Sequence, residues 1–457
     1  MELSVLTNIS PIDGRYSNKL TELRDIFSEY GLFKYRLQIE INWLQKLANT
    51  KEIKEIPLFC KDIKDFLNSL INNFNQDDAS YIKSIEKKTN HDIKAIEYFI
   101  KDKINHIPEL KNISEFVHFA CTSEDINNLS YALMLKKARC DVIAPYWHKL
   151  INEIKILAKK YKDIPLLSRT HGQPATPSTI GKEMANTVFR MKRQLKKLND
   201  IEILGKINGA VGNYNAHLIA YPEVNWLQLS KDFVTSLGIV WNPYTTQIEP
   251  HDYISELFDC IIRFNNVLID FNSDIWLYIS LNYFNQKIDN KTEIGSSTMP
   301  HKINPIDLEN SEGNLGMANT IMKHLSSKLL VSRLQRDLTD STVLRNIGVG
   351  ISYSVIAYQS ALKGISKLEI NRDCLFNDLE NNWAVLAEPI QTVMRRYGVN
   401  KPYEQLKDLT YGNDIDAITI RKFIDTLKIP EEEKVRLKKL TPHNYLGYAV
   451  KLVDNLN

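Results

Sequence analysis

The sequence contains little cysteine. Its 457 residues include five cysteines, which are scattered, odd in number and never arranged as a Cys-x-x-Cys pair (Cys60, Cys121, Cys140, Cys260 and Cys374). Zinc sites usually draw on closely spaced cysteines, and disulfide-stabilised domains are cysteine-rich and secreted. We therefore expect a reducing compartment and no zinc site.

Long apolar runs and a strong charge of either sign are also absent. No window of about 18 uncharged apolar residues occurs, and the first residues, MELSVLTNISPIDGRY, lack the basic and apolar regions of a signal peptide. The formal net charge is +3 without a dense basic block, which makes nucleic acid a poor candidate partner. The apolar fraction of 43% is typical of globular chains, and the length suits two or three domains. We expect a cytoplasmic protein that binds neither membrane nor nucleic acid.

The alternating pattern of a β-sheet is missing too, apart from weak candidates between residues 201 and 207. Apolar residues instead recur every three or four positions in several long segments (146–161, 182–198, 306–328 and 341–369). The longest run, Asp252–Gln286, has no Gly or Pro and predicts one helix of roughly 50 Å. Its apolar residues cover more than one face, so we expect several copies to associate into one large bundle around it. The sequence predicts an all-α fold.

One loop concentrates groups that can perform chemistry. Residues Glu293–Pro305 read EIGSSTMPHKINP, in which glycine and two prolines predict a connection between helices. Lys302 supplies a positive charge and Asn304 supplies hydrogen-bond donors. A serine among them, Ser296 or Ser297, can act as a base because its alkoxide is stabilised where it forms. An ordinary Ser/Pro-rich connector is the alternative on this composition alone.

A second loop carries a histidine. His171 stands in LLSRTHGQPATPST (residues 166–179), before Gly172 and two prolines, and we expect it in a loop at helix ends. A histidine there can donate a proton to a leaving nitrogen, although most loop histidines are ordinary surface residues. The stretch GKINGAVGNYNAH (residues 205–217) either brings backbone close to a ligand or is a flexible turn.

Two short motifs combine helix caps with groups that suit an anion. TNHD ends in three polar residues, of which Asn90 or Asp92 can cap the following helix, while His91 at that N-terminus can face a bound anion. In FACTSEDINNL, Thr122 and Ser123 either start a helix or hydrogen-bond a substrate carboxylate. The spacing alone does not choose between these interpretations.

Arginines gather late in the chain, in LVSRLQRDLTDSTVLRN, around two hydroxyl residues (Arg336, Ser341, Thr342 and Arg345). Forked guanidinium groups suit phosphate or carboxylate oxygens, and the pair Arg15 and Tyr16, after a turn near the N-terminus, can join the same clamp. The alternative is a solvated face whose charge is balanced by neighbouring aspartates.

Several motifs together resemble one enzyme family. GSSTMPHKINP is similar to the GSSxMPxKxNP signature of the fumarase/aspartase superfamily, whose members cleave C–N or C–O bonds to release fumarate. SPIDGRY, TNHD, TSED, RTHGQPA and RDLTDSTVLRN, with the histidine of MPHK, resemble the adenylosuccinate lyases of that superfamily, in their longer bacterial form. The resemblance runs over essentially the whole chain.

The resemblance implies a three-domain, all-α, fumarase/aspartase-like fold with a long central helical bundle. The expected parts are an N-terminal helical domain (1–111), a central long-helix bundle domain (112–365) and a C-terminal helical domain (366–457). A homotetramer with a 20-helix core is also implied, in which each active site is assembled from three subunits.

The implied reaction is β-elimination of fumarate from adenylosuccinate to give AMP, and from SAICAR to give AICAR, in purine biosynthesis, without a metal or cofactor. By the resemblance, His171 would protonate N6 of the purine as the general acid, and Ser296 would remove the Cβ proton of the succinyl group. Ser297 is the alternative base, which the sequence does not separate from Ser296. Glu309 would orient and polarise His171.

The resemblance also assigns residues to the substrate, whose charged groups sit at two ends. The succinyl carboxylates, which must stabilise the carbanion, would be held by Thr122, Ser123, Lys302 and Asn304. The phosphate and ribose would be held by Arg15, Tyr16, Arg336, Ser341 and Arg345, with Thr342 beside them. Asn90, His91, Asp92, Gln247 and Asn310 would line the remaining contacts.

Two other functions compete with this one. Argininosuccinate lyase or aspartase belongs to the same superfamily, but the arginine and hydroxyl set suits a phosphate and speaks against both. A helical scaffold without catalysis is the second alternative, and the intact Ser296, Lys302 and His171 speak against it.

Overall fold

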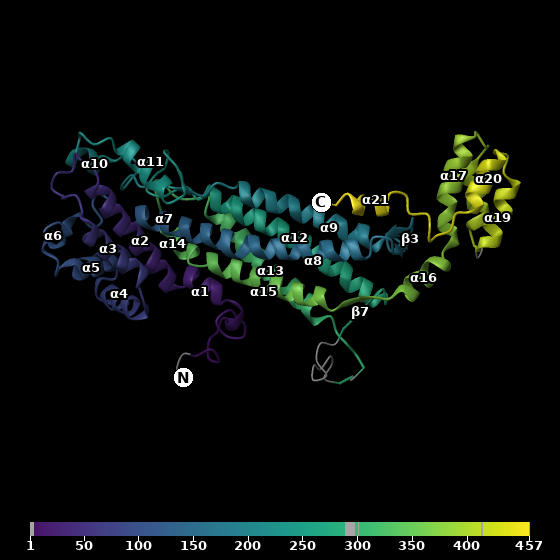
Figure 1. The fold of residues 1–457 in the computed structure, drawn as a ribbon, viewed down its shortest axis with the longest axis horizontal. Helices are drawn as coiled ribbons and strands as arrows, with labels where there is room; N and C mark the ends of the chain where they lie inside the picture. The colour runs from purple at the N-terminus through teal and green to yellow at the C-terminus, as the bar shows by residue number, and fades with distance from the viewer. Residues whose placement is uncertain (1–3, 288–297, 300, 413–414, 457) are drawn as a thin grey trace. The chain divides into compact units, whose positions relative to one another are not determined.

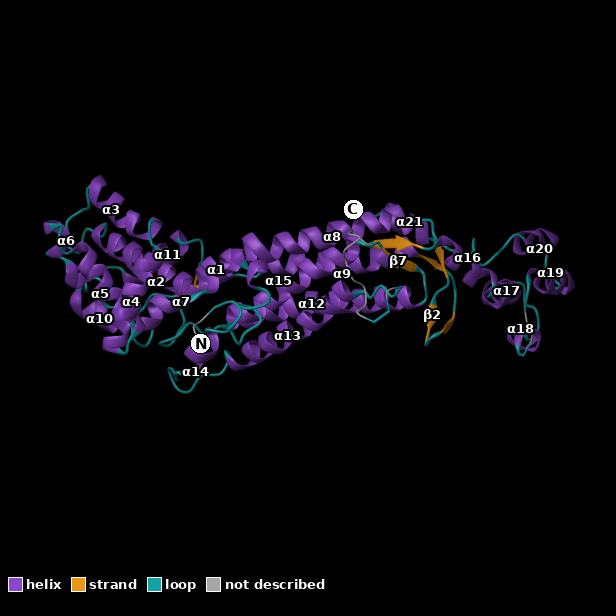
Figure 2. Cartoon of the chain, turned by 90° about the horizontal axis from the view of Figure 1, so that it is seen from below, coloured by secondary structure: helices purple, strands orange, loops and turns teal. Residues whose placement is uncertain are grey.

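The computed structural model describes residues 4–287, 298–299, 301–412 and 415–456. Nearly all of its regular structure is helical, and the strands in these ranges have only two or three residues each (Figures 1 and 2). The all-α prediction is therefore confirmed. No helix within the described ranges is long and apolar enough to cross a bilayer.

The first part of the chain contains α1 (Thr21–Phe27), α2 (Glu29–Ala48), α3 (Lys61–Asn72), α4 (Gln76–Thr89), α5 (Asp92–Ile104), α6 (Pro108–Lys111) and α7 (Ser123–Lys137), with 3-10 turns η1 (Ser17–Lys19) and η2 (Ser114–Phe116). A π-helical segment, η3 (Ala138–Ile143), joins α7 to α8 (Ala144–Lys160). Then follow α9 (Ile180–Asp200), α10 (Asn215–Ala220), α11 (Trp226–Ser236), α12 (Asp252–Ser280), α13 (Ile306–Lys328), α14 (Thr339–Leu344) and α15 (Ile347–Ser366). The last helices are α16 (Arg372–Glu380), the 3-10 turn η4 (Trp383–Leu386), α17 (Ala387–Arg396), α18 (Pro402–Thr410), α19 (Ala417–Thr426), α20 (Glu431–Lys438) and α21 (Ala449–Asp454).

The short strands form isolated pairs. Three pairs are antiparallel: β1 (Pro165–Leu166) with β4 (Ser178–Thr179), β2 (Arg169–Thr170) with β3 (Gln173–Pro174), and β7 (Phe284–Gln286) with β8 (Leu368–Ile370). One pair is parallel, β5 (Leu204–Gly205) with β6 (Val240–Trp241), and it lies where the sequence offered its weak strand candidates.

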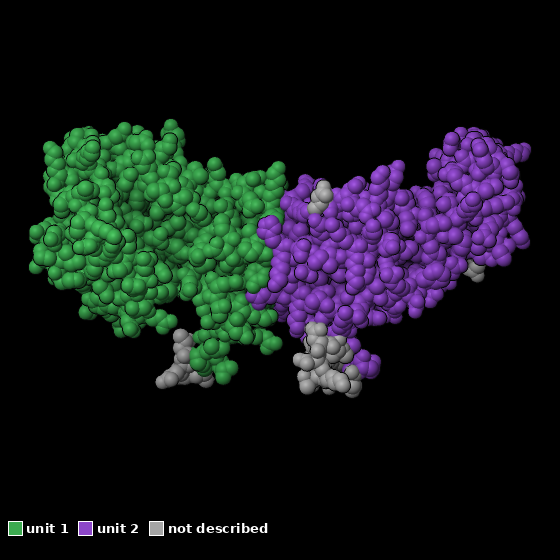
Figure 3. All heavy atoms as spheres, viewed as in Figure 1, with its two compact units in different colours: residues 1–146, 194–265, 313–357 green, residues 147–193, 266–312, 358–457 purple. Residues whose placement is uncertain are grey.

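The chain divides into two compact units (Figure 3). Unit 1 contains residues 1–146, 194–265 and 313–357, and unit 2 contains residues 147–193, 266–312 and 358–457. Each unit is discontinuous because the long helices α9, α12, α13 and α15 contribute residues to both. The three domain boundaries expected from the resemblance stay a prediction.

The long helices follow the predicted periodicity, with two corrections. Helix α12 ends at Ser280 and does not reach Gln286, so its 29 residues span about 43 Å at 1.5 Å per residue. The chain leaves the helix because Asn282 has a left-handed backbone (φ 60°) and the next residues pair with β8. The segment expected to be helical from 341 to 369 is likewise interrupted between α14 and α15.

Buried polar side chains link the long helices within each unit. In unit 1, Asn265 of α12 donates to Asn319 Oδ1 of α13 at 2.9 Å and to Ser354 Oγ of α15 at 3.0 Å. In unit 2, Asn272 of α12 donates to Ser311 Oγ of α13 at 3.0 Å. A buried amide without a partner is costly, so these bonds fix how the helices are aligned along one another.

Candidate functional site

The two predicted helix caps lie in unit 1, and one of them differs from expectation. Thr122 is the N-cap of α7, and its amide donates to Asp125 Oδ2 at 2.8 Å, as the TSED motif predicted. The cap of α5, however, is His91, whose Nδ1 accepts from the Lys94 amide at 3.2 Å. Asn90 instead ends α4 in a left-handed conformation (φ 53°). An imidazole nitrogen can thus replace the carboxylate or amide that the sequence favoured as cap.

Asp92 and Arg345 are brought together in unit 1. Arg345 Nη2 lies 3.1 Å from Asp92 Oδ2, and its Nη1 lies 3.3 Å from Glu29 Oε2. Asp92 also receives Arg36 Nη2 at 2.8 Å, and Arg36 is buried. Burial alone would raise the pKa of the Asp92 carboxyl, but Arg36, the Ile93 amide and Arg345 together hold that pKa below its usual range.

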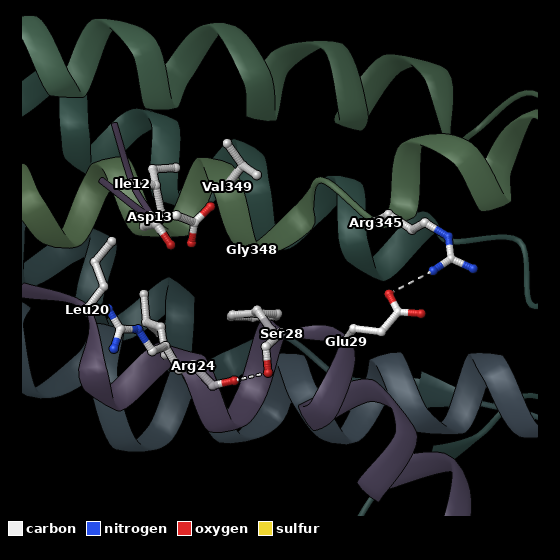
Figure 4. Close-up of a pocket in the computed structure, with 12 residues that line it drawn as sticks. Ile12, Asp13, Leu20, Arg24, Ser28, Glu29, Arg345, Gly348 and Val349 are labelled. Atoms are coloured by element: carbon white, nitrogen blue, oxygen red, sulfur yellow. Dashed lines mark hydrogen bonds and ion pairs between the residues drawn. The ribbon is translucent and has the colours of Figure 1, made fainter. Parts of the chain in front are cut away.

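Arg345 borders a cavity between α1 and α15 (Figure 4). The cavity has a volume of about 330 Å³, and its lining combines apolar residues with polar and charged ones (Asp13, Arg24, Ser28, Glu29, Arg345 and Ser352). Figure 4 shows the guanidinium of Arg345 pointing toward Glu29. A cationic side chain at the rim of a partly polar cavity can bind an anionic group, provided that Glu29 yields its place.

Arg336 and Gln247 also meet in unit 1. Arg336 Nη1 donates to Gln247 Oε1 at 3.2 Å, and its Nη2 lies 3.3 Å from Glu124 Oε2. Glu124 directly follows Ser123, so this arginine connects two expected binding segments. Burial raises the pKa of Glu124 although Arg336 opposes that rise.

Ser341 is next to a second buried carboxylate of this network. Its amide donates to Asp340 Oδ1 at 2.6 Å, and Arg336 Nη2 lies 3.6 Å from the same oxygen. His251, which is buried, has Nε2 3.8 Å from Asp340 Oδ2. Burial would raise the pKa of Asp340, whereas His251 and Arg336 lower it overall. Thr342 follows on the exposed side of α14.

The remaining expected contacts of unit 1 lie near the N-terminus. Arg15 is exposed, and Tyr16 is half-buried with its amide donating to the Pro11 carbonyl at 2.9 Å. Both precede η1, which leads into α1 and the cavity beside Arg345.

His171 occupies the tip of a β-hairpin in unit 2, rather than a plain loop between helices. Strands β2 and β3 pair Thr170 with Gln173, which leaves His171 and Gly172 as a two-residue turn. Both turn residues have positive φ (53° and 77°), the combination required by a type I′ turn. The turn thus places the exposed His171 at the end of a short β-hairpin.

Charged groups anchor the base of this hairpin. Arg169 of β2 donates to Tyr283 Oη and lies 2.8 Å from Asp378 Oδ2 of α16, and Tyr283 Oη donates to the same carboxylate. Burial and the hydrogen bond to Asp378 raise the pKa of Tyr283. A planar guanidinium held by two partners restricts the direction in which the hairpin leaves the helices.

The other expected residues of unit 2 lie at or just before the start of α13. Glu309 Oε1 accepts from Trp276 Nε1 at 3.1 Å, and Asn310 Oδ1 accepts from Ser360 Oγ at 2.8 Å. Lys302 is exposed, and Asn304 is half-buried. Ser296 and Ser297 lie outside the described residues.

The structure therefore assembles the expected residues in two groups, with Arg336–Gln247 and Arg345–Asp92 as direct pairs. The sequence did not single out Glu29 and Glu124 as partners of these arginines, because partners distant in sequence leave no local pattern. Asp340, four residues from Arg336, is one of the neighbouring aspartates expected to balance the charge of this segment. Within the described ranges, no three His, Cys, Asp or Glu side chains are grouped as a metal site requires.

Comparison with known proteins identifies the family. The Lyase family model matches residues 14–322, and the Adenylosuccinate lyase C-terminal model matches residues 332–446. The chain is 67% identical to "Adenylosuccinate lyase" of Escherichia coli strain K12 over 456 residues, with full coverage of both chains. It is 64% identical to the Haemophilus influenzae protein of the same name, again over the full length. The chain belongs to the adenylosuccinate lyase family.

Solved structures support the fold independently. The chain matches a fumarate lyase from Mesorhizobium sp. BNC1 with a TM-score of 0.77 at 16% identity, covering 95% of this chain and 97% of the other. It matches 3-carboxy-cis,cis-muconate lactonizing enzyme from Pseudomonas putida with a TM-score of 0.71 at 21% identity, covering 95% and 96%. At these identities the likeness shows the fold alone, and it confirms the fumarase/aspartase-like architecture.

Proposed function

We propose that the chain is a C–N lyase that eliminates fumarate from adenylosuccinate to give AMP, and from SAICAR to give AICAR. One observation carries the proposal: the 67% identity to a curated adenylosuccinate lyase extends over the full length of both chains. The expected site residues are present throughout the matched regions, which supports the same chemistry in this chain.

The reaction needs a base and an acid on opposite sides of the bond that breaks. Removal of the Cβ proton of the succinyl group leaves a carbanion next to a carboxylate, which is stabilised as an aci-carboxylate by nearby donors. The C–N bond then breaks, its electron pair goes to N6 of the purine, and a proton completes the leaving amine. The products are fumarate and AMP, and no redox step or cofactor is needed.

His171 is the proposed acid. Its place at the tip of an anchored hairpin suits a group that must reach toward a substrate, because the imidazole is exposed while its backbone is fixed. Ser296 is the proposed base, with Lys302 and Asn304 supporting the carboxylate charge. Glu309, which lies at the start of α13 and bonds Trp276, would orient His171 when the two belong to different subunits.

The two charged ends of the substrate would be held by different sets of residues. Thr122 and Ser123 at the N-terminus of α7 would hold succinyl carboxylate oxygens, since helix N-termini favour anions. The guanidinium groups of Arg336 and Arg345, with Arg15, Tyr16 and Ser341, would take the phosphate and ribose. Arg345 must then exchange its bond to Glu29 for one to the substrate.

We also propose that the protein is a homotetramer with active sites shared between subunits, working in the cytoplasm. Several large apolar side chains of the long helices are exposed in the single chain, which supports association through them (Phe189, Trp276, Leu277, Ile306 and Met317, each 42–61% exposed). Mixing inactive His171→Ala and Ser296→Ala proteins tests this. If each site takes the two residues from different subunits, about a quarter of the sites recover both.

The function is tested by incubating the purified protein with adenylosuccinate and, separately, with argininosuccinate. Formation of AMP and fumarate in equal amounts from the first substrate, with no fumarate from the second, is the expected result. Fumarate from argininosuccinate alone would replace the proposal by the related reaction. Absence of fumarate from both substrates would favour a non-catalytic role.

A further inference from the structure

A buried ion pair lies directly behind the residues expected to hold the succinyl group. The side chains of Asp125 and Lys206 are both 0% exposed, and Asp125 Oδ1 lies 2.9 Å from Lys206 Nζ. Asp125 is the third residue of α7, which begins at Ser123. Lys206 belongs to the glycine-containing stretch 205–217, whose role the sequence left open. Neither residue was expected in the site.

The Asp125 carboxylate joins two segments of backbone. Its Oδ2 accepts from the Thr122 amide at 2.8 Å and from the Gly209 amide at 3.1 Å. Its Oδ1 accepts from the Asn208 amide at 2.9 Å, in addition to the Lys206 ammonium. Four donors therefore converge on one side chain, and only a carboxylate has two accepting oxygens to serve them.

The loop of residues 206–210 also binds the segment that contains Thr245 and Gln247. Gln247 Nε2 donates to the Ala210 carbonyl at 3.2 Å, and Asn208 Nδ2 donates to Thr245 Oγ1 at 2.7 Å. Gln247 in turn contacts Arg336. Residues 206–210 thus connect the segment of Thr122 and Ser123 to the segment of Gln247. On one side Asp125 binds the amides of Thr122, Asn208 and Gly209, and on the other Gln247 binds the Ala210 carbonyl.

We propose that Asp125 and Lys206 are positioning residues that set Thr122 and Ser123 in place for the succinyl carboxylates. This inference rests on the proposed function, because it takes the succinyl end to lie at these two residues. Lys206 has a second role, since an unneutralised carboxylate behind the site would repel a dianionic ligand. Neither side chain is exposed to touch the substrate, so both act through Thr122 and Ser123.

The two single variants separate geometry from charge. In Asp125→Asn, one carboxylate oxygen becomes an NH2 group, which cannot accept a hydrogen bond from a backbone amide. The Thr122 segment is then held less firmly. In Lys206→Met, the three backbone donors keep their acceptor but the negative charge is no longer balanced. Both variants should weaken ligands that carry the two carboxylates of the succinyl group and spare ligands that lack them.

The experiment measures equilibrium binding of fumarate and of AMP, each without the other, to the purified full-length protein. We expect about tenfold weaker fumarate binding in Asp125→Asn and in Lys206→Met, with AMP binding within about twofold of the wild type. Arg139→Met is the matched control, because Arg139 donates to the carbonyls of Leu198 and Ile201, which belong to the same unit and precede the 206–210 loop. It should leave both affinities unchanged.

Hydrogen exchange supplies a readout of geometry. The Thr122 and Gly209 amides should exchange faster in Asp125→Asn but not in Arg139→Met. Equal weakening of fumarate binding and AMP binding in the two variants would overturn the proposal. It would also be overturned if the Thr122 and Gly209 amides exchanged faster in Asp125→Asn while fumarate binding stayed unchanged. If Asp125→Asn does not fold, unchanged fumarate binding in Lys206→Met overturns it equally. Since turnover is not used, a wild-type protein that binds fumarate without cleaving adenylosuccinate would contradict only the proposed function.

Discussion

The turn that carries His171 allows a sharp test of the acid's position. Gly172 has φ +77°, and a Cβ at this residue would meet no atom within 4 Å. Replacing it by alanine therefore creates no clash and acts only through the backbone, because a left-handed conformation costs a non-glycine residue about 1–2 kcal/mol. Asparagine tolerates this conformation better than alanine does, so Gly172→Asn is the matched control.

The size of the effect follows from that cost. If the strained turn rearranges, the population with His171 in its present place falls by about 5- to 30-fold, since each 1.4 kcal/mol corresponds to a factor of ten. We expect kcat for adenylosuccinate to fall within that range in Gly172→Ala and by less than about threefold in Gly172→Asn. Because the tip is exposed, the midpoint of thermal unfolding should hardly change in either variant.

Steady-state kinetics and a thermal melt of the three proteins complete the test. Wild-type kcat in Gly172→Ala would refute the claim that the type I′ turn positions the acid. Equal losses in both variants would refute the claim that backbone conformation, rather than the added side chain, is responsible.

Three further predictions concern other contacts within the two units. Asp378→Asn weakens the anchor of Arg169 and should lower kcat more than it raises KM, which steady-state kinetics can measure; an effect on KM alone would count against it. Gly212→Ala places a Cβ 2.5 Å from the Thr245 carbonyl oxygen on a backbone with φ +82°, so it should cost at least about 2 kcal/mol in chemical denaturation, and wild-type stability would contradict the geometry. Asp92→Asn should lower the free energy of unfolding by about 2 kcal/mol at pH 7. Because the folded-state pKa of Asp92 is depressed, its stabilisation is complete above the unfolded value of about 3.9 and is lost as pH falls further, so the wild type and variant should converge in acid; a constant difference would disprove this origin.

Local patterns in the sequence predicted most of the helices. The bounds of α13 follow its three-and-four spacing, since Pro305 stops any extension toward the loop before it. Helix α12 ended earlier than expected because strand β7 pairs with β8, which lies more than 80 residues further on. A partner so far away cannot be read from the periodicity of the helix itself, so the same residues fit both structures until the pairing is known.

The candidate site was predictable where its residues belong to motifs. Thr122, Ser123 and His171 stand in short conspicuous motifs. Their places at a helix N-terminus and a tight turn are compatible with the proposed binding of a carboxylate and donation of a proton. The residues that support them are different: Asp125 looks like half of a capping box, and Lys206 looks like an ordinary surface lysine. Their burial against each other arises only when α7 and the 206–209 loop meet. Sequence motifs therefore predict candidate contact residues, but they do not reveal which buried residues lie behind them.

The most direct test of the account is product formation by wild-type and His171→Ala proteins from adenylosuccinate, measured side by side. We expect AMP and fumarate in equal amounts from the wild type, and a rate lower by about 10²–10⁴-fold in His171→Ala, since general acid catalysis contributes a factor of that order. Fumarate release by His171→Ala at the wild-type rate would contradict the role of the hairpin, and no fumarate from the wild type would contradict the proposed function.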